Sequence, residues 1–356
     1  MVERVQRAHT KGQIDRAGEY LLPWWKDGGD VPKDGPKYYE IIQNWRSSHA
    51  LPLHAFRVVL QGRAKRLDPK VLIAQRLKRF SSVMNKLARE ETMQLSQMQD
   101  LGGCRAIVDT VEMVREIYDV YRTSDDHNEA PLFISSKRPR CFDYIQEPKP
   151  DGYRGIHIVG RYAARAEINE PWNGHRIEIQ LRSKLQHAFA TTVETVTTFT
   201  REPLKFGAGP ESWQRFFALV GSALAIREGT PLVPGTPDNR SDLVRELREF
   251  TEHLDVHRRL RNWTNAIKQL PRKNVSQYKW LLLVLDLKTN EISVTGYAEK
   301  RQAARELEKI EKGPNAKSLD AVMVWVRSIY DLRDAYPNYY ADTTDFVKAL
   351  DVAMAS

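Results

Sequence analysis

The stretch RPRCFDYIQEPKPDGYRGIHIVGRY, residues 138–162, joins a turn-rich loop to a strand and decides how the middle of the chain is built. Cations, aromatics and turn-forming residues crowd its first part. Its end, continued as GIHIVGRYAA over residues 155–164, has the period-2 alternation of a strand. Tyr153 stands between a glycine and Arg154, and His157 follows on the strand. A glycine-flanked aromatic among cations is typical of a mobile binding loop and of a base-stacking platform.

The segment HRIEIQLRS, residues 175–183, predicts a second strand beside the first. Period-2 alternation puts Glu178, Gln180 and Arg182 on one face, while two isoleucines and a leucine share the other face. A row of Glu, Gln and Arg is costly to bury. We therefore expect this face to line a solvated, functional cleft.

The segment DLGGCRAIV, residues 100–108, predicts a third strand that opens after a Gly-Gly turn. Asp100 precedes the turn, and Arg105 lies early on the strand. If this strand neighbours the one that carries Glu178, the two carboxylates could hold Mg²⁺, which uses one or two carboxylates plus substrate phosphates. The alternative is that both are surface acids paired with arginines.

The remaining pattern predicts an α+β fold, a mixed sheet flanked by helices followed by a small C-terminal α+β domain. Apolar residues are spaced as in helices from about 36 to 95, with Leu72, Ile73 and Leu77 among them. Further helices are expected at residues 111–121, 185–199, 211–228, 240–268, 300–312 and 343–354, and further strands at 277–287, 291–297 and 320–328. The predicted domains are residues 1–270 and 271–356.

Composition narrows the class of protein. Of the 356 residues 41% are apolar, and no run approaches the roughly 18 apolar residues of a membrane span. The first residues lack the apolar core of a secretory signal. Cys104 and Cys141 cannot build a disulfide framework and fit a reducing compartment. We expect a cytoplasmic protein with no membrane partner.

The basic excess is confined to the N-terminal part. Residues 271–356 hold 13 Lys+Arg and 12 Asp+Glu, so +8 of the net +9 lies in residues 1–270. Two clusters supply much of it: Arg57, Arg63, Lys65, Arg66 and Lys70, then Arg76, Lys78, Arg79, Lys86 and Arg89. Such a surface suits RNA or a nucleotide. The alternative is a solvated helix face compensated by glutamates.

Four motifs in order over about 120 residues resemble the RelA/SpoT family of alarmone synthetases. FDYIQEPKPDGYRGIH is similar to the acceptor-binding loop of that family, and DLGGCR to its Asp-hydrophobic-Ala-Gly-hydrophobic-Arg element. RIEIQLRS is similar to its Glu-Ile-Gln-Ile-Arg-Thr strand, and QRLKRFSSVMNKL to its Arg-hydrophobic-Lys helix. The resemblance implies a nucleotidyltransferase-like fold and an ATP-dependent pyrophosphokinase, which moves the β,γ-pyrophosphate of ATP onto a ribose 3′-hydroxyl.

The resemblance also implies roles for the donor side of this reaction. Arg76 and Arg105 would stack on the two faces of the adenine. Asp100 and Glu178 would carry the Mg²⁺ cofactor, and Glu178 would orient or deprotonate the attacking hydroxyl. The cations expected to contact the triphosphate are Lys78, Arg79 and Lys149.

On the acceptor side, Tyr153 would stack on the acceptor base. Arg154 and His157 would line its phosphate or ribose, with Gln180 and Arg182 on the neighbouring strand. A histidine that is only part of the strand packing is the alternative for His157.

Departures from the family pattern bear on the acceptor and on regulation. Gly155 replaces the usual Ser, and Ser183 the usual Thr. The first hundred residues hold no His-Asp pair, so we expect no hydrolase domain before the synthetase region. A synthetase of this kind is potentially toxic and needs another restraint.

The C-terminal segment SIYDLRDAYPNYYADTTDF resembles CapRel, the fused toxin–antitoxin branch of the family. The resemblance implies antiviral defence: Tyr336 and Tyr339 would occlude the nucleotide site until a phage protein binds, and the acceptor would be the 3′ end of tRNA. The alternatives are tyrosines that only pack the last helix, a guanosine alarmone synthetase that uses GDP or GTP, and a non-catalytic RNA-binding or sensing protein. Retention of both Asp100 and Glu178 disfavours the last.

Overall fold

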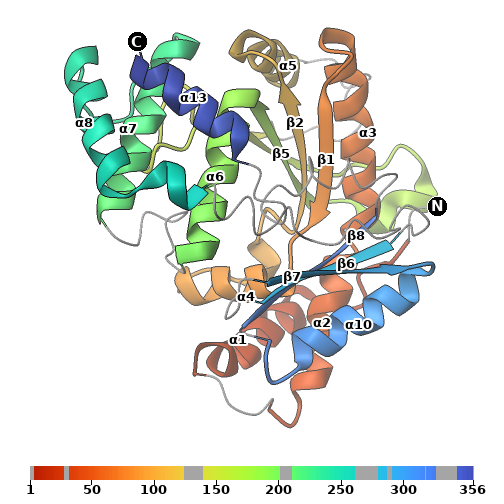
Figure 1. Cartoon of the computed structure of the whole chain (residues 1–356). Coiled ribbons are helices and arrows are strands. Elements are labelled where there is room, and N and C mark those ends of the chain that lie inside the picture. Colours follow the sequence, from red (N-terminus) through yellow and green to blue (C-terminus); the bar gives the residue numbers. More distant parts are fainter. Residues whose placement is uncertain are drawn as a thin grey trace.

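The computed structural model describes residues 4–27, 32–123, 139–200, 211–260, 280–286, 291–316, 318–325 and 343–355. Its main sheet has five strands in the order β1-β2-β5-β4-β3, of which β1, β2 and β5 are labelled in Figure 1. They are β1 (Leu72–Leu77), β2 (Gly102–Val108), β3 (Arg140–Asp143), β4 (Ile156–Arg161) and β5 (Arg176–Ser183). Only β2 and β5 pair in parallel. The sheet is mixed and flanked by helices, so the α+β expectation is confirmed.

The strand register gives the main sheet one apolar face and one polar face. Ile177, Ile179 and Leu181 of β5 are fully buried on the apolar face. Two helices, α3 (Ala50–Leu67) and α5 (Val111–Thr123), cover that face and form one hydrophobic core with it. Burial of these side chains supplies the main driving force for this layer. The predicted alternation along residues 175–183 is thus confirmed.

A second core fixes the segment that leads into β2. It joins α1 (Lys11–Asp27), α2 (Gly35–Ser47) and α4 (Phe80–Arg89), with a short 3-10 turn at Leu95–Gln97. Leu101 is fully buried in this core, and the indole of Trp25 donates to Asn85 of α4 at 2.7 Å. Because Leu101 is anchored, the preceding Asp100 has a defined position at the start of β2.

The expectation of helical structure from about 36 to 95 is wrong for Leu72–Leu77, which form β1. β1 pairs antiparallel with β2, with Leu72 opposite Ile107 and Arg76 opposite Gly103. A short apolar run fits either period, and its partner strand decides which is formed. Arg76 therefore lies on a strand and not on a helix.

A third core is helical. It combines α6 (Lys184–Thr200), α7 (Glu211–Glu228), α8 (Arg240–His253) and the last helix, α13 (Thr344–Ala355), which group beside the sheet in Figure 1. The helix expected over 240–268 is interrupted, because α8 ends at His253 and Asp255 adopts φ 48°. Among residues other than glycine, Asp adopts a positive φ more readily than most.

A small sheet carries the C-terminal strands in the order β7-β6-β8. Its elements are β6 (Trp280–Asp286), β7 (Glu291–Tyr297), α10 (Lys300–Lys312) and β8 (Leu319–Trp325). The hydroxyl of Tyr39 in α2 donates to the buried Glu311 of α10 at 2.5 Å, so this unit contacts the N-terminal helices. The small sheet and α13 thus contact different parts of residues 4–260. No helix among the described residues is both long and apolar enough to cross a membrane.

Candidate active site on the polar face of the sheet

The polar face of the main sheet brings together most of the candidate residues. Glu178, Gln180 and Arg182 alternate along β5, and cross-strand pairing puts His157 of β4 opposite Gln180. On the other side, Arg105 of β2 also lies opposite Gln180. Directly opposed residues share a face. By the same register, Arg76 is opposite Gly103, which is itself opposite Glu178.

Five of these side chains form a closed ring of hydrogen bonds. Glu178 Oε1 is 3.0 Å from His157 Nδ1, and His157 Nε2 is 2.6 Å from the hydroxyl of Tyr153. That hydroxyl accepts from Arg182 Nη2 at 3.0 Å, and the same nitrogen donates to Gln180 Oε1 at 3.1 Å. Gln180 Nε2 then donates to Glu178 Oε2 at 2.7 Å. The ring links the carboxylate to the loop aromatic through polar groups that satisfy one another.

The ring shifts the proton affinities of its members. Burial raises the pKa of Glu178, but the charge and hydrogen bond of His157 outweigh this and hold it well below its usual range. Burial lowers the pKa of His157, while Tyr153 and Glu178 raise it to about 9. Burial raises the pKa of Tyr153, but Arg182 and His157 outweigh this effect and lower it to about 8. At neutral pH the ring therefore contains an ionised carboxylate beside a protonated imidazole.

A tight turn holds Tyr153 in this position. The backbone N–H of Tyr153 donates to Asp151 Oδ1 at 3.0 Å, and that of Gly152 donates to the carbonyl of Lys149 at 2.9 Å. Gly152 has φ 84°, and a Cβ there would lie 2.4 Å from the carbonyl oxygen of Phe217 in α7. The loop is thus packed against α7 in this structure.

An aromatic and cationic cluster extends the site from Tyr153. Lys149 Nζ is 4.3 Å from the ring centroid of Tyr144 and 5.3 Å from that of Tyr153. The Tyr144 ring stacks on Phe142 of β3 and meets His157 edge to face. Cations near these faces suit a planar, negatively charged ligand.

Asp100 lies beside this face in a cationic setting. Its carboxylate accepts from Lys78 Nζ at 2.7 Å and from Lys86 Nζ of α4 at 3.1 Å. Burial raises the pKa of Asp100, and the two lysines outweigh this and lower it. Glu178 is near enough to raise the same pKa, so the two carboxylates sense each other.

The donor chemistry of Asp100 and Glu178 fits Mg²⁺, a hard cation that takes carboxylate oxygens and substrate phosphates. Both carboxylates are ionised, and they come from the start of β2 and from its parallel neighbour β5. No cluster of three or more possible ligands occurs in the described ranges. The fit is therefore to a metal that shares its coordination shell with substrate phosphates.

Arg105 lies between the sheet and α6. Burial, followed by the nearby charge of Arg182, lowers the pKa of Arg105 to about 9. Its buried Nε has no hydrogen-bond partner in the described structure, and neither does the buried Nδ1 of the half-buried His187 on α6. Arg105 and Arg182 together push the pKa of His187 well down, after burial. A buried, unsatisfied guanidinium nitrogen is suited to a ligand acceptor.

Two candidates lie outside the shared face. The Arg154 side chain is 2% exposed, pairs with Glu228 of α7 at 3.1 Å and donates to Thr230 at 3.0 Å. It ties the loop to α7 and does not join the ring. Arg79 is 6% exposed at the residue before α4. Tyr336 and Tyr339 lie outside the described residues.

Sequence reasoning missed three residues as members of the site: Tyr144, Lys86 and His187. Tyr144 is part of the quoted FDYIQ motif, so its position in the motif could have identified it. Lys86 was counted only as surface charge. No sequence signal pairs it with Asp100, because the contact depends on how α4 packs.

Comparisons with known proteins place this face within a recognised region. Residues 75–201 match a family model described as the region found in RelA / SpoT proteins. The match contains every described candidate residue. An uncharacterized protein of Mycobacterium tuberculosis is 26% identical over 186 residues, which is 52% of this chain and 59% of that protein. GTP pyrophosphokinase YwaC of Bacillus subtilis is 32% identical over 89 residues, 24% of this chain and 38% of that protein.

Two solved structures match about half of the chain at low similarity. A GTP pyrophosphokinase family protein from Streptococcus pneumoniae is 22% identical with a TM-score of 0.41, covering 52% of this chain and 90% of that one. Small alarmone synthetase 1 from Bacillus subtilis, bound to its product pppGpp, is 18% identical with a TM-score of 0.42, covering 52% of this chain and 94% of that one.

Proposed function

We propose that this protein is an ATP-dependent pyrophosphokinase that transfers the β,γ-pyrophosphate of ATP to a ribose 3′-hydroxyl. One observation carries the proposal: the polar face, with its closed ring and the cations around it, lies wholly within the residues that match the RelA / SpoT region. A face that presents carboxylates, arginines and a tyrosine is suited to two nucleotides. An ordinary packing surface would not retain so many buried polar groups.

On the donor side, Arg76 and Arg105 bind the adenine. Arg105 keeps an unsatisfied Nε within a buried setting, which gives a ligand nitrogen or phosphate oxygen a partner. Lys78, Arg79 and Lys149 are assigned to the triphosphate. Of these, Lys149 is the best placed for an incoming ligand, because Lys78 pairs with Asp100 and Arg79 is buried.

Asp100 and Glu178 would hold Mg²⁺, which neutralises charge on the transferring group when it is bound. Lys78 and Lys86 keep Asp100 ionised before any ligand enters. Glu178 has a lowered pKa, which makes it a weak base. Its role is therefore to accept a hydrogen bond from the attacking hydroxyl and to orient it, and this suffices because phosphoryl transfer depends mainly on positioning.

On the acceptor side, the Tyr153 ring binds the base, while its hydroxyl stays in the ring with His157 and Arg182. This arrangement orders the aromatic before the acceptor arrives, which reduces the entropy lost on binding. Gln180 holds Glu178 and Arg182 at a fixed separation.

For the acceptor we propose the 3′ end of tRNA, whose modification would block aminoacylation and translation. The support is the +8 charge of residues 1–270, with exposed cations at Lys65, Arg66 and Lys70. The first two lie at the end of α3, on the opposite side of the sheet from Glu178, so they would contact the body of a long polyanion.

A second candidate is a guanosine nucleotide, GDP or GTP. The observation in its favour is the 32% identity to a GTP pyrophosphokinase over 89 residues. Both candidates use the same polar face. The acceptor alone distinguishes them.

We further propose that residues 271–356 form a regulatory domain that inhibits the enzyme as an antitoxin would, until a phage protein binds in antiviral defence. The support is the resemblance around Tyr336 and Tyr339. The contact of Glu311 with Tyr39 and Gln43 offers a route by which the small sheet can act on the N-terminal part.

Labelled ATP tests the activity and the acceptor together. The protein is incubated with Mg²⁺, γ-labelled ATP and either GDP and GTP or bulk tRNA, with Glu178→Gln as the matched control. We expect label in tRNA with the native protein and none with the variant. Label in GDP or GTP selects the second candidate, and no label in either pool contradicts the proposed activity.

A further inference from the structure

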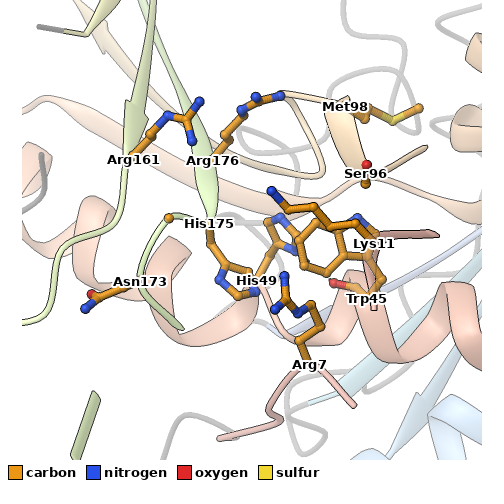
Figure 2. A pocket seen from close by; sticks show the side chains of 11 residues that line it. Arg7, Lys11, Trp45, His49, Ser96, Met98, Arg161, Asn173, His175 and Arg176 are labelled. Carbon is orange, nitrogen blue, oxygen red and sulfur yellow. Dashed lines mark hydrogen bonds between the residues drawn. The ribbon is translucent and has the colours of Figure 1, made fainter. Parts of the chain in front are cut away.

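A cationic cavity lies at the end of the main sheet where β4 stops and β5 starts (Figure 2). Its volume is about 110 Å³, several times the roughly 10–15 Å³ that a cavity needs to hold one water. The residues that line it come from the N-terminal segment, from α2 and its junction with α3, from the segment of Ser96 and Met98, and from the end of β4 and the chain that leads into β5. None of them belongs to the ring or to the Asp100 cluster.

Four cations surround this cavity: Arg7, Lys11, Arg161 and Arg176. Within the part of the chain that the structure describes, none of the four forms an ion pair. Arg161 and Arg176 lie directly opposite each other on β4 and β5. Like charges at directly opposed positions destabilise a strand pair. An anion between them would remove this cost.

The floor of the cavity is a cluster of three rings, Trp45, His49 and His175, all less than 9% exposed. The ring centroids of His49 and His175 are 4.7 Å apart. Both nitrogens of His175 are engaged, Nδ1 with the carbonyl of Trp172 at 2.7 Å and Nε2 with Ser48 at 2.9 Å. His49 Nδ1 lies 2.8 Å from the carbonyl of Trp45.

Two buried atoms of this floor have no hydrogen-bond partner in the described structure, Trp45 Nε1 and His49 Nε2. The indole N–H can only donate. Burial, and then His175, lower the pKa of His49 to about 3, so its imidazole is neutral. Because Nδ1–H donates to a carbonyl, Nε2 of His49 can only accept. An occupant of the cavity that reached both atoms would have to accept one hydrogen bond and donate another.

We propose that this cavity binds a phosphate group that retains one proton, as in orthophosphate or a phosphate monoester, at a site separate from the polar face. Its oxygens would accept from Trp45 and from the surrounding cations, and its hydroxyl would donate to His49. A sulfate ion or a backbone phosphodiester carries no such proton at neutral pH, whereas orthophosphate always keeps one and a phosphate monoester, with a second pKa of about 6, keeps it in part. The site should therefore prefer phosphate to sulfate and a terminal phosphate to an internal one.

A larger neighbouring cavity has room for the rest of such a ligand. It has a volume of about 530 Å³, within the range of small-molecule sites, and shares Lys11, Ser96 and Arg176 with the first cavity. Gln94, Gln97 and Gln99 line it, so amide groups are available for a base or a ribose. The shared chemistry is a nucleotide with a terminal phosphate, which is either free or at the 5′ end of an RNA.

Calorimetric titration of the full chain with orthophosphate tests the site without ATP or transfer, so the result does not depend on the proposed function. We expect one phosphate per chain at this site and an affinity at least about tenfold lower for sulfate. The double variant Arg161→Gln/Arg176→Gln and the single variant Trp45→Phe should each weaken binding by about tenfold or more. Arg165→Gln is the matched control, because Arg165 is exposed and lines neither cavity.

Each outcome decides the proposal. The proposal is overturned if phosphate binding is unchanged in both the double variant and the correctly folded Trp45→Phe protein. It is also overturned if sulfate binds with the same affinity as phosphate. Loss of binding in Arg105→Gln would instead assign the phosphate to the polar face. Competition by nucleoside monophosphates identifies a free nucleotide, and competition by a 5′-phosphorylated RNA but not by its dephosphorylated form identifies an RNA end. Failure of both to displace orthophosphate overturns the assignment to a nucleotide.

Discussion

The hydroxyl of Tyr153 lies 2.6 Å from Nε2 of His157, whose other ring nitrogen lies 3.0 Å from Glu178. One imidazole thus joins the aromatic proposed to bind the acceptor base to the carboxylate proposed to orient its hydroxyl. A shift of the tyrosine would be transmitted to the carboxylate through a single side chain. The proposed base binding and the proposed hydroxyl orientation are therefore physically linked.

Tyr153→Phe tests this link by removing the hydroxyl and keeping the ring. The change leaves His157 Nε2 and Arg182 Nε without their acceptor, while Arg182 Nη2 keeps Gln180, so we expect the free energy of unfolding to fall by about 1–3 kcal/mol. The acceptor KM should rise only modestly, and Tyr153→Ala should raise it further because stacking is lost as well. Tyr144→Phe is the control, since the Tyr144 hydroxyl forms no hydrogen bond with any described residue. Equal effects of Tyr153→Phe and Tyr144→Phe would contradict the ring.

Asp100→Asn and Glu178→Gln should each reduce kcat by about a hundredfold or more, because each removes one carboxylate proposed to hold Mg²⁺. The fold should persist in both. Asp100→Asn should also lower stability, since Lys78 and Lys86 lose their counter-charge. Transfer rates and thermal unfolding are measured together. If both folded variants keep most of the activity, the assignment of Asp100 and Glu178 as Mg²⁺ ligands is wrong.

The pH dependence of stability should report on His157. Its pKa is raised from 6.5 to about 9, so its stabilising contribution is complete below pH 6.5 and is lost as pH rises toward 9. The pKa of Tyr153 is lowered to about 8, so ionisation of Tyr153 adds stability only above pH 8. We therefore expect the free energy of unfolding to fall between pH 6.5 and 8.

Denaturant titration across this window is the measurement, with His157→Gln as the comparison. The buried His49 and His175 have lowered pKa values, so their contributions change only below pH 6.5 and do not interfere. The variant should show a flatter profile than the native protein. An unchanged slope would mean that His157 does not titrate in this way.

The alternation of residues 175–183 was enough to predict the polar row on β5. It could not give the register with β4, which sets His157 opposite Gln180 and depends on the whole sheet. It also could not place Arg154, because period-2 reasoning fails in a turn and its partner Glu228 comes from a distant helix. The helix predicted at Leu72–Leu77 was wrong for a related reason. Only the pairing with β2 distinguishes that strand from a helix.

Gly152 provides a test of how the loop is positioned. Gly152 and Gly174 have nearly the same dihedral, φ 84° and 85°, but only Gly152 has neighbours that a Cβ would meet. Gly152→Ala should therefore cost about 1–3 kcal/mol more than Gly174→Ala, because it adds a clash with the Phe217 carbonyl to a similar backbone strain. Equal losses of stability would show that the loop can move off α7.

The last prediction concerns the restraint on activity. If Tyr336 and Tyr339 occupy the adenine site, ATP competes with them and the two forms are in equilibrium. A trigger protein must then bind the open form more tightly, and moving the population from 1:99 to 99:1 requires about 5.5 kcal/mol of differential affinity. Tyr336→Ala/Tyr339→Ala should remove the occluding rings and give a constitutively toxic enzyme that needs no trigger.

A second variant separates occlusion from docking of the C-terminal unit. Glu311 is 7% exposed and bonds to Tyr39 and Gln43 of α2, so Glu311→Gln weakens the contact of α10 with that helix while both tyrosines remain. If docking holds the tyrosines in place, Glu311→Gln should raise basal transfer above that of the native protein but below that of the double tyrosine variant. Cell growth and label transfer without a trigger measure both. A folded double variant that is harmless in cells and still requires a trigger would make the tyrosines structural and end the autoinhibition model.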